Sequence, residues 1–441
     1  MAKLFFETYG CQMNHAEADS LIPKSIQRGH SITERPEDAD VIIINTCSVR
    51  LTAESHVIGR LGYYRMLNKE RLDRDLKIIL MGCMSENIGL EVKKQFSDIV
   101  SILWGTYNKD LFLDYIEDFE VKQESLGFGA AYSFMPATAS KEYFFKAYLP
   151  ISHGCNKHCS YCIVPKVRGL EKNRNFQDVI DNAKQLVDEG VKEICLLGQT
   201  IDTYKYENKR LPDILETIAR QSGAERITFL TSHPKEFLYE TIELMNTYSN
   251  IMPFLHLPFQ SGNSRILKEM KRNYTIEQYL EKVENIRKIR PNIILSTDII
   301  VGFPSETEKE FEDTVETLKK VRYNEAFMYR YNTRPNTPAE KFTEQIPEED
   351  KLRRLDILVK THRGIMSELL AGQIGSQTTA LFDRESKYSD KVFKETGQKQ
   401  YLGRTLNNTV CILDSSIDLR GNIVPVELYD SLNAVMKAKL I

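Results

Sequence analysis

The sequence lacks long apolar runs and an excess of positive charge, and it contains few cysteines. No stretch of about eighteen apolar residues occurs, so no segment predicts a membrane-spanning helix. The start, MAKLFFETYGCQMN, has one basic residue and too short an apolar run for a signal peptide. A net charge of −3 gives no global basic field that would indicate a nucleic-acid partner, although a local patch would suffice. We therefore expect a cytoplasmic protein.

Three of the eight cysteines fall in one short stretch, SHGCNKHCSYCIVP. In a reducing compartment, clustered thiols indicate a metal site or catalysis rather than disulfides. Cys155, Cys159 and Cys162, called here the barrel trio, have neither the paired knuckles of a zinc site nor the spacing of a ferredoxin run. Three thiolates on one loop suit a 4Fe–4S cluster with one iron left open. Zinc, or thiols that are only structural, is the alternative.

Three other cysteines each end a short apolar run: KLFFETYGC, DVIIINTC and KIILMGC. Cys11, Cys47 and Cys83, called here the upstream trio, are 36 residues apart, which suits a repeating strand–helix unit. Right-handed crossovers make such strands parallel, so the three thiols are expected at the same sheet edge, where ligands bind. Three buried core cysteines are the plain alternative.

Six further strand-like segments alternate with helical ones and predict a partial or complete parallel barrel. They are residues 143–152, 191–199, 225–233, 252–260, 292–303 and 324–332. The barrel trio follows the first, at the end of the barrel where active sites lie. A helix is expected after Pro347, and short strands with turns from about Ser376 predict a small all-β domain. The expected organisation is an N-terminal domain (1–120), a linker (121–142), a barrel (143–372) and a C-terminal domain (373–441).

The C-x3-C-x2-C motif after the first barrel strand resembles that of the radical S-adenosylmethionine (SAM) superfamily. With the upstream trio and the small β domain, nearly the whole chain is similar to the methylthiotransferase family. The motifs TYGCQMN, NTCSVR, GCM and LLGQ most resemble the branch that modifies isopentenylated adenosine in tRNA. The resemblance implies an N-terminal Rossmann-like α/β domain, a central (partial) radical-SAM βα barrel and a C-terminal TRAM domain, an OB-like RNA-binding module.

The resemblance also implies a chemistry. The barrel trio would hold a 4Fe–4S cluster whose open iron binds S-adenosylmethionine, and one electron would generate a 5′-deoxyadenosyl radical. That radical would attack C2 of N6-isopentenyl(dimethylallyl)adenosine at position 37 of tRNA. The upstream trio would hold a second 4Fe–4S cluster that presents the sulfur, which a second S-adenosylmethionine methylates. The implied partners are tRNA and an electron donor such as a flavodoxin, with the protein acting as a monomer.

Polar and glycine residues near strand ends resemble family positions that line the cofactor and substrate mouth, although loop packing would also explain each of them. They are Tyr161, Gly198, Gln199, Ser232, His233, His256, Gln260, Asp298, Gly302, Arg330 and Arg334. The two arginines are expected just after the last barrel strand, facing the cavity, where they would pair with a carboxylate or phosphate.

RNA contacts are expected from basic residues near the barrel trio and from aromatic residues of the C-terminal domain. The basic residues, which a solvated loop would also explain, are Lys157, Lys166, Arg168, Lys172 and Arg174. The aromatic residues, which are either stacking platforms or core, are Tyr388, Phe393 and Tyr401. Cys195 and Cys411 alternate with apolar neighbours and are expected to be inert buried thiols.

Two alternatives to this function stay open. The first is methylthiolation of another target, either threonylcarbamoyl-adenosine in tRNA or a ribosomal-protein residue. The pair Gln12-Met13 after Cys11 argues against both targets, because related branches are expected to carry other residues there. The second is a two-cluster electron-transfer or RNA-binding protein without catalysis.

Overall fold

The computed structural model describes residues 1–48, 51–71, 75–117, 125–127 and 132–441. The last two residues of the NTCSVR motif and residues 121–124 and 128–131 of the expected linker lie outside the described residues. In the described part of that segment, Ser125 pairs with Trp104 and so extends the N-terminal sheet. Ala139 pairs with Ala147 and so extends the sheet of the central domain.

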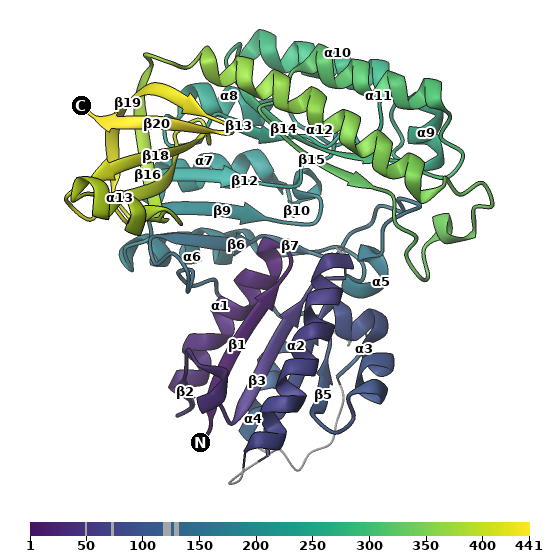
Figure 1. The fold of residues 1–441 in the computed structure, drawn as a ribbon, viewed down its shortest axis with the longest axis vertical. Helices are drawn as coiled ribbons and strands as arrows, with labels where there is room; N and C mark the ends of the chain where they lie inside the picture. Colours follow the sequence, from purple (N-terminus) through teal and green to yellow (C-terminus); the bar gives the residue numbers. More distant parts are fainter. Residues whose placement is uncertain (49–50, 72–74, 118–124, 128–131) are drawn as a thin grey trace.

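The N-terminal domain is a five-stranded parallel sheet in the order β2-β1-β3-β4-β5 with helices on both faces (Figure 1). The strands are β1 (Lys3–Tyr9), β2 (Ser31–Ile32), β3 (Val41–Thr46), β4 (Lys77–Gly82) and β5 (Val100–Trp104). The helices are α1 (Gln12–Gln27), α2 (Leu51–Glu70), α3 (Cys83–Gln95) and α4 (Lys109–Glu117), with a short η1 at Pro36–Asp38. Every residue of β3 is buried, as expected for a central strand covered on both faces.

The central domain is a partial barrel of six parallel strands with helices on its outer face. The strands are β6 (Lys146–Pro150), β9 (Glu193–Leu197), β12 (Arg226–Phe229), β13 (Phe254–His256), β14 (Ile294–Val301) and β15 (Glu325–Arg330). One parallel bridge, Ile227 to Ile251, joins the β6-β9-β12 half to the β13-β14-β15 half. Between the described residues of β6 and β15 there is no pairing, so the barrel is open on that side.

The main barrel helices are α6 (Phe176–Asp188), α7 (Leu211–Gln221), α8 (Glu240–Thr247), α9 (Ser264–Glu269), α10 (Ile276–Ile289), α11 (Glu308–Val321) and α12 (Glu348–Ala371). Shorter elements are α5 (Val164–Arg168), η2 (Ile201–Thr203), η3 (Pro338–Lys341), β7 (Ser152–His153), β8 (Lys172–Asn173), β10 (Lys205–Tyr206) and β11 (Lys209–Arg210). Thr275 and Thr307 begin α10 and α11 with reciprocal capping boxes, which satisfy backbone N–H groups that have no partner inside the helix. None of the described helices is long and apolar enough to cross a membrane.

Strand alternation sets which side chains face the inside of the barrel. On β14, Leu295 and Ile299 lie in the core beneath the outer helices, so Asp298 between them faces inward. Asp298 is opposite Phe327 of β15. Phe327 therefore shares the inner face, while its neighbour Met328 packs against the outer core.

The C-terminal domain is a closed five-stranded barrel that docks on the amino ends of the central strands. Its strands are β16 (Gln377–Glu385), β17 (Lys399–Thr405), β18 (Val410–Ser415), β19 (Ile423–Leu432) and β20 (Val435–Leu440), with α13 at Ser389–Thr396. Arg226, at the start of β12, donates hydrogen bonds to the backbone oxygens of Arg404 at 2.9 Å and Thr379 at 3.1 Å. The carboxyl ends of the central strands therefore point away from this domain (Figure 1). The predicted three-part α/β architecture with a small C-terminal barrel is confirmed.

Candidate active site

The upstream trio lies at the carboxyl edge of the N-terminal sheet. Cys11 is the N-cap of α1, Cys47 follows β3 and Cys83 is the first residue of α3. The Cys47 thiol interacts with the thiols of both Cys11 and Cys83. Gly10, with φ of +127°, makes this approach possible, because a Cβ there would lie 2.2 Å from Cβ of Cys47. The three strand ends therefore meet as one site, as their spacing predicted.

The environment of the upstream trio favours thiolates at Cys11 and Cys83, whereas the interactions with these two thiols and burial raise the pKa of Cys47 well above its ordinary value. The hydrogen bond with Cys47 lowers the pKa of Cys11 to about 6, against the opposing effect of burial. A hydrogen bond with Cys47 also lowers the pKa of Cys83, and the positive charge of Arg168 lowers it further. Thiolate is the form of cysteine that binds metal.

The barrel trio lies on the loop that follows β6 and β7. The backbone N–H of Lys157 donates to Sγ of Cys155 at 3.4 Å, and Oγ1 of Thr200 lies 3.5 Å from the same sulfur. Arg272 donates from Nη1 to Sγ of Cys159 at 3.5 Å. Burial raises the pKa of the Cys162 thiol to about 12, so this thiol needs a bound cation to lose its proton at neutral pH.

The two trios approach each other across the inner side of the barrel. Cys83 packs with Ile163 and Val167, which follow the barrel trio directly in sequence. Cys11 belongs to a cluster that joins α1 to inward-facing residues of the barrel. Its other members are Met13, Ala16, Tyr148, Cys195, Leu197 and Leu230. Arg334 interacts electrostatically with Cys47 and with Cys162, one cysteine from each trio. Six cysteines from two domains therefore line one region.

The donor chemistry of both trios fits iron–sulfur clusters. Within the described ranges, no group of three Cys, His, Asp or Glu side chains has the arrangement that holds a single metal ion. Each trio instead offers three sulfur atoms and at least one N–H donor directed at a sulfur, from Arg168 at 3.2 Å or Arg272 at 3.5 Å. Hydrogen bonds to sulfur are a regular feature of iron–sulfur sites.

The predicted cofactor-contact residues of β13 and β14 gather on the inner face of the barrel. His256 contacts Oγ of Ser296 through Nδ1 at 2.8 Å and a carboxylate oxygen of Asp298 through Nε2 at 3.2 Å. The ring of Phe327 lies edge-on to His256 with centroids 6.1 Å apart. Gln260, at φ of +67°, is held by backbone hydrogen bonds to Asp298 and Ile300. These residues form a polar and aromatic wall.

The predicted residues after β9 and β12 form a second group. Gly198 is buried, and a Cβ there would lie 2.5 Å from Oγ of Ser152, while Gln199 beside it is half-buried. Ser232 and the backbone N–H of His233 donate to the Asp202 carboxylate at 3.3 and 2.6 Å. Asp202, which sequence reasoning missed, therefore holds this loop in place.

Two predicted contact residues have clear packing roles. Tyr161 is half-buried against an apolar cluster that includes Ile266 and Phe303. Gly302, at φ of +70°, makes room for Lys351 of α12, because a Cβ there would lie 2.4 Å from Cγ of that lysine. Contact of either residue with a cofactor stays a prediction.

One sequence-based expectation is wrong, and the structure also places the aromatic residues and thiols whose roles the sequence left open or expected to be inert. Arg330 is the last residue of β15 and pairs with Glu348 of α12, so it lies on the outer face of the strand rather than facing the cavity. Tyr401 is buried in the C-terminal barrel and is core, whereas Tyr388 and Phe393 are exposed. Cys411 is buried in that core and Cys195 faces α1, as inert thiols would.

The five basic residues that were expected to bind phosphate differ in exposure. Arg168 and Arg174 are buried and bonded to Glu17 and Asn182, respectively, so they are not available to RNA. Lys157 is paired with Glu236. Only Lys166 and Lys172 of the five basic residues are exposed.

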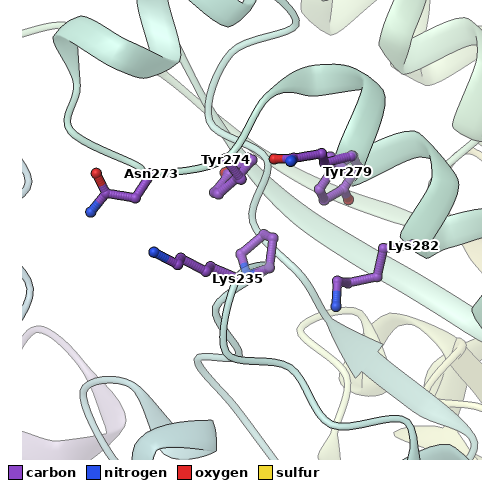
Figure 2. A pocket seen from close by; sticks show the side chains of 7 residues that line it. Lys235, Asn273, Tyr274, Tyr279 and Lys282 are labelled. Carbon is purple, nitrogen blue, oxygen red and sulfur yellow. The ribbon is translucent and has the colours of Figure 1, made fainter.

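A small basic pocket includes Tyr274, whose hydroxyl accepts from Arg272, the arginine that donates to Cys159. Its volume is about 250 Å³, and it is lined by Pro234, Lys235, Asn273, Tyr274, Gln278, Tyr279 and Lys282. Figure 2 shows Lys235, Asn273 and Lys282 around the opening. Lysine and amide side chains without a carboxylate among the lining residues suit an anion such as phosphate.

Comparison with known proteins agrees with this geometry. Residues 149–318 match the family model of the Radical SAM superfamily, and residues 3–104 match Uncharacterized protein family UPF0004. The chain is 37% identical to a tRNA-2-methylthio-N(6)-dimethylallyladenosine synthase of Clostridium botulinum, over 97% of this chain and 94% of the relative. A synthase of the same name from Aquifex aeolicus is 33% identical, over 100% and 98% of the two chains. The chain belongs to the tRNA-2-methylthio-N(6)-dimethylallyladenosine synthase family.

Solved structures support the fold. The radical S-adenosylmethionine methyltransferase TsrM from Kitasatospora setae aligns with a TM-score of 0.56 at 11% identity, covering 76% of each chain. At this identity the likeness concerns the architecture alone. The family predicted from the cysteine motifs is confirmed, whereas the individual site residues remain predictions.

Replacing one cysteine of either trio is expected to remove one cluster. Anaerobically reconstituted protein should hold about eight irons, and Cys47→Ser or Cys159→Ser should each hold about four. Iron and acid-labile sulfide analysis measures this. Cys411→Ala, in the distant C-terminal core, should keep the full content. Full iron content in both site variants would contradict the assignment of ligands.

The buried Asp202 should make stability depend on pH. Burial raises its pKa from 3.8 to about 7, so the folded state holds a proton that the unfolded state releases. This stabilising effect is complete below about pH 4 and is lost as pH rises through 7. Relative to Asp202→Asn, the wild-type free energy of unfolding should fall by about 2–4 kcal/mol between pH 4 and 7. Urea unfolding at several pH values measures this, with exposed Asp181→Asn as the control. Parallel pH profiles for wild type and Asp202→Asn would refute it.

Proposed function

We propose that the protein is a tRNA methylthiotransferase that adds a methylthio group to C2 of N6-isopentenyl(dimethylallyl)adenosine at position 37 of tRNA. The observation that supports this most strongly is the meeting of two cysteine trios at the carboxyl mouth of a partial barrel. Relatives that carry this activity in their names align with nearly the full chain. S-Adenosylmethionine and two 4Fe–4S clusters are the cofactors.

The residues present suit the tasks of this reaction. Cys155, Cys159 and Cys162 would hold the cluster that, with S-adenosylmethionine bound, supplies radical chemistry able to remove an unactivated hydrogen. The protein's own contribution is to position the reactants and to exclude side reactions. Packing of α1 against the inner faces of β6 and β9 closes one half of the barrel, which limits the access of water.

The opposite half of the barrel offers a wall for the base. Phe327 and Tyr329 lie on the inner face of β15 with 45% and 36% of their surfaces exposed, which is unusual for aromatic residues inside a barrel. Aromatic faces stack on bases and also contact an apolar isopentenyl group. The base would then lie between β15 and the upstream trio, which presents sulfur on the other side.

RNA contacts outside the cavity are proposed at two places. The basic pocket around Lys235 and Lys282 would take a backbone phosphate of the anticodon loop. Tyr388 and Phe393, both exposed on the C-terminal barrel, would stack on bases of the same tRNA. We place the reaction in the cytoplasm, with the protein acting as a monomer and a flavodoxin-like protein as electron donor.

An anaerobic assay tests the proposed function. Reduced protein is incubated with S-adenosylmethionine and an anticodon stem-loop that carries the isopentenyl group. We expect 5′-deoxyadenosine and a methylthiolated nucleoside, detected by mass spectrometry. Modification of a threonylcarbamoyl-adenosine stem-loop instead would favour the other target, and absence of 5′-deoxyadenosine would favour a non-catalytic protein.

Removal of the aromatic wall should reduce the preference for the isopentenylated stem-loop over the unmodified one. Base–aromatic stacking contributes about 1–3 kcal/mol, so Phe327→Ala should lower the affinity for the isopentenylated stem-loop about tenfold. Fluorescence anisotropy with isopentenylated and unmodified stem-loops measures this. Met328→Ala, on the outer face of the same strand, is the matched control and should affect stability alone. Equal affinities of Phe327→Ala and wild type for the isopentenylated loop would rule out this wall.

A further inference from the structure

One arginine connects the two cysteine trios. Arg168 is the last residue of α5 and lies six residues after Cys162, so it belongs to the segment that carries the barrel trio. Its guanidinium nevertheless reaches the other site, where Nε donates to Sγ of Cys83 at 3.2 Å. The Arg168 side chain is only 2% exposed. Its position is therefore determined by contacts with the N-terminal domain.

The one carboxylate beside Arg168 does not balance the two buried cations around it. Glu17 of α1 accepts from Nη1 of Arg168 at 2.7 Å and from Nη2 at 3.4 Å. The same carboxylate also pairs with Lys109 of α4. Among the described residues it is the one carboxylate paired with either cation. With Lys109 protonated, one positive charge exceeds what Glu17 balances, although burial lowers the pKa of Lys109; no side chain of the three is more than 3% exposed.

The surplus positive charge lies beside the upstream trio. A buried charge is costly unless a counter-charge lies close to it. The sulfur of Cys83 is in hydrogen-bond contact with Arg168, so a negatively charged group held by this trio would supply the counter-charge. An oxidised 4Fe–4S cluster bound by three thiolates has a net charge of −1, which would balance the extra positive charge.

Other contacts keep Arg168 in this orientation. Oγ1 of Thr106 donates to the backbone oxygen of Val167 at 2.8 Å, and the Tyr107 hydroxyl donates to that of Arg168 at 3.4 Å. Nδ1 of His153 lies 3.4 Å from Nη1 of Arg168. The end of α5 is therefore fastened to the loop between β5 and α4, beside the Cys83 sulfur.

We propose that Arg168 is a positioning residue of the upstream cluster, whose ligand Cys83 it holds against the barrel and whose reduction potential it raises. This inference rests on the proposed function only in taking the upstream trio as cluster ligands. Hydrogen bonds to sulfur and nearby positive charge both favour the reduced, more negative state of a cluster. The segment that follows the barrel trio in this way also determines how the upstream cluster faces it.

Redox titration of the upstream cluster tests the proposal. The parent protein is the full chain with Cys155, Cys159 and Cys162 changed to Ala, so that only the upstream trio binds iron. Arg168→Gln removes the charge, and Arg168→Lys keeps the charge but loses the forked geometry. Arg174→Gln is the matched control, because Arg174 is a buried arginine of the same segment that bonds to Asn182 and to no thiol. Spectra are recorded by electron paramagnetic resonance at stepped potentials.

We expect a more negative potential for Arg168→Gln, a smaller shift for Arg168→Lys and none for Arg174→Gln. Loss of iron from Arg168→Gln alone would also support the proposal. Unchanged potential and full iron in Arg168→Gln would overturn it, and so would equal iron loss in Arg174→Gln. If the parent itself binds no cluster, the ligand assignment fails instead, which separates the two claims.

In the otherwise unmodified enzyme, Arg168→Gln should lower the yield of methylthiolated nucleoside while 5′-deoxyadenosine is still formed. S-Adenosylmethionine cleavage by the barrel site should continue, because among the described residues the guanidinium of Arg168 bonds to Cys83, Glu17 and His153 and not to the barrel trio. Methylthiolated nucleoside should fall at least tenfold relative to 5′-deoxyadenosine. A proportional loss of both products, with Arg168→Lys no better than Arg168→Gln, would indicate general structural damage and overturn the positioning role.

Discussion

Packing of α1 against the inside of the barrel is the contact on which the site depends. An α/β sheet delivers ligands at the carboxyl ends of its strands, and a barrel does the same at its own mouth. Each domain contributes three thiols at that end of its strands. Because α1 begins at Cys11 and lies on the inward-facing side chains of Tyr148 and Leu197, the two carboxyl ends face each other. The proposed chemistry needs this arrangement, since the base must lie between a radical source and a sulfur source.

The electrostatics of the two trios differ in a way that suits different tasks. The upstream trio lies beside a buried surplus of positive charge and includes thiols whose pKa values are lowered. In the barrel trio, burial raises the pKa values of Cys155 and Cys162, although Arg272 donates to the sulfur of Cys159. A site that favours anionic sulfur is suited to holding sulfur for transfer. At the barrel trio, burial disfavours free thiolates. This trio is therefore suited to binding the positively charged S-adenosylmethionine only once the negatively charged cluster is in place.

Much of this fold was predictable because local patterns determined it. Apolar runs ending in cysteine identified β1, β3 and β4, and strand–helix alternation identified all six barrel strands. The common location of Cys11, Cys47 and Cys83 followed from the topology of parallel strands. The same patterns gave the order of the domains, and the family motifs then indicated what kind of domain each one is.

Long-range contacts explain what the sequence did not predict. Arg168 is one of five basic residues in a short segment, so a phosphate contact was expected. Its true partner, Glu17, lies 151 positions away and on another domain, where no local pattern indicates it. Arg330 is similar, because only the packing of α12 shows that Glu348 lies against the outer face of β15. Asp202 was missed because a buried aspartate has no distinguishing pattern in the sequence.

Iron-edge anomalous diffraction from an anaerobically grown crystal would test the central claim most directly. The claim is that both trios hold clusters and that these clusters face each other across one cavity. The account predicts two iron peaks, one at Cys11, Cys47 and Cys83 and one at Cys155, Cys159 and Cys162, with no protein side chain separating them. A single peak, or two peaks separated by packed side chains, would contradict it.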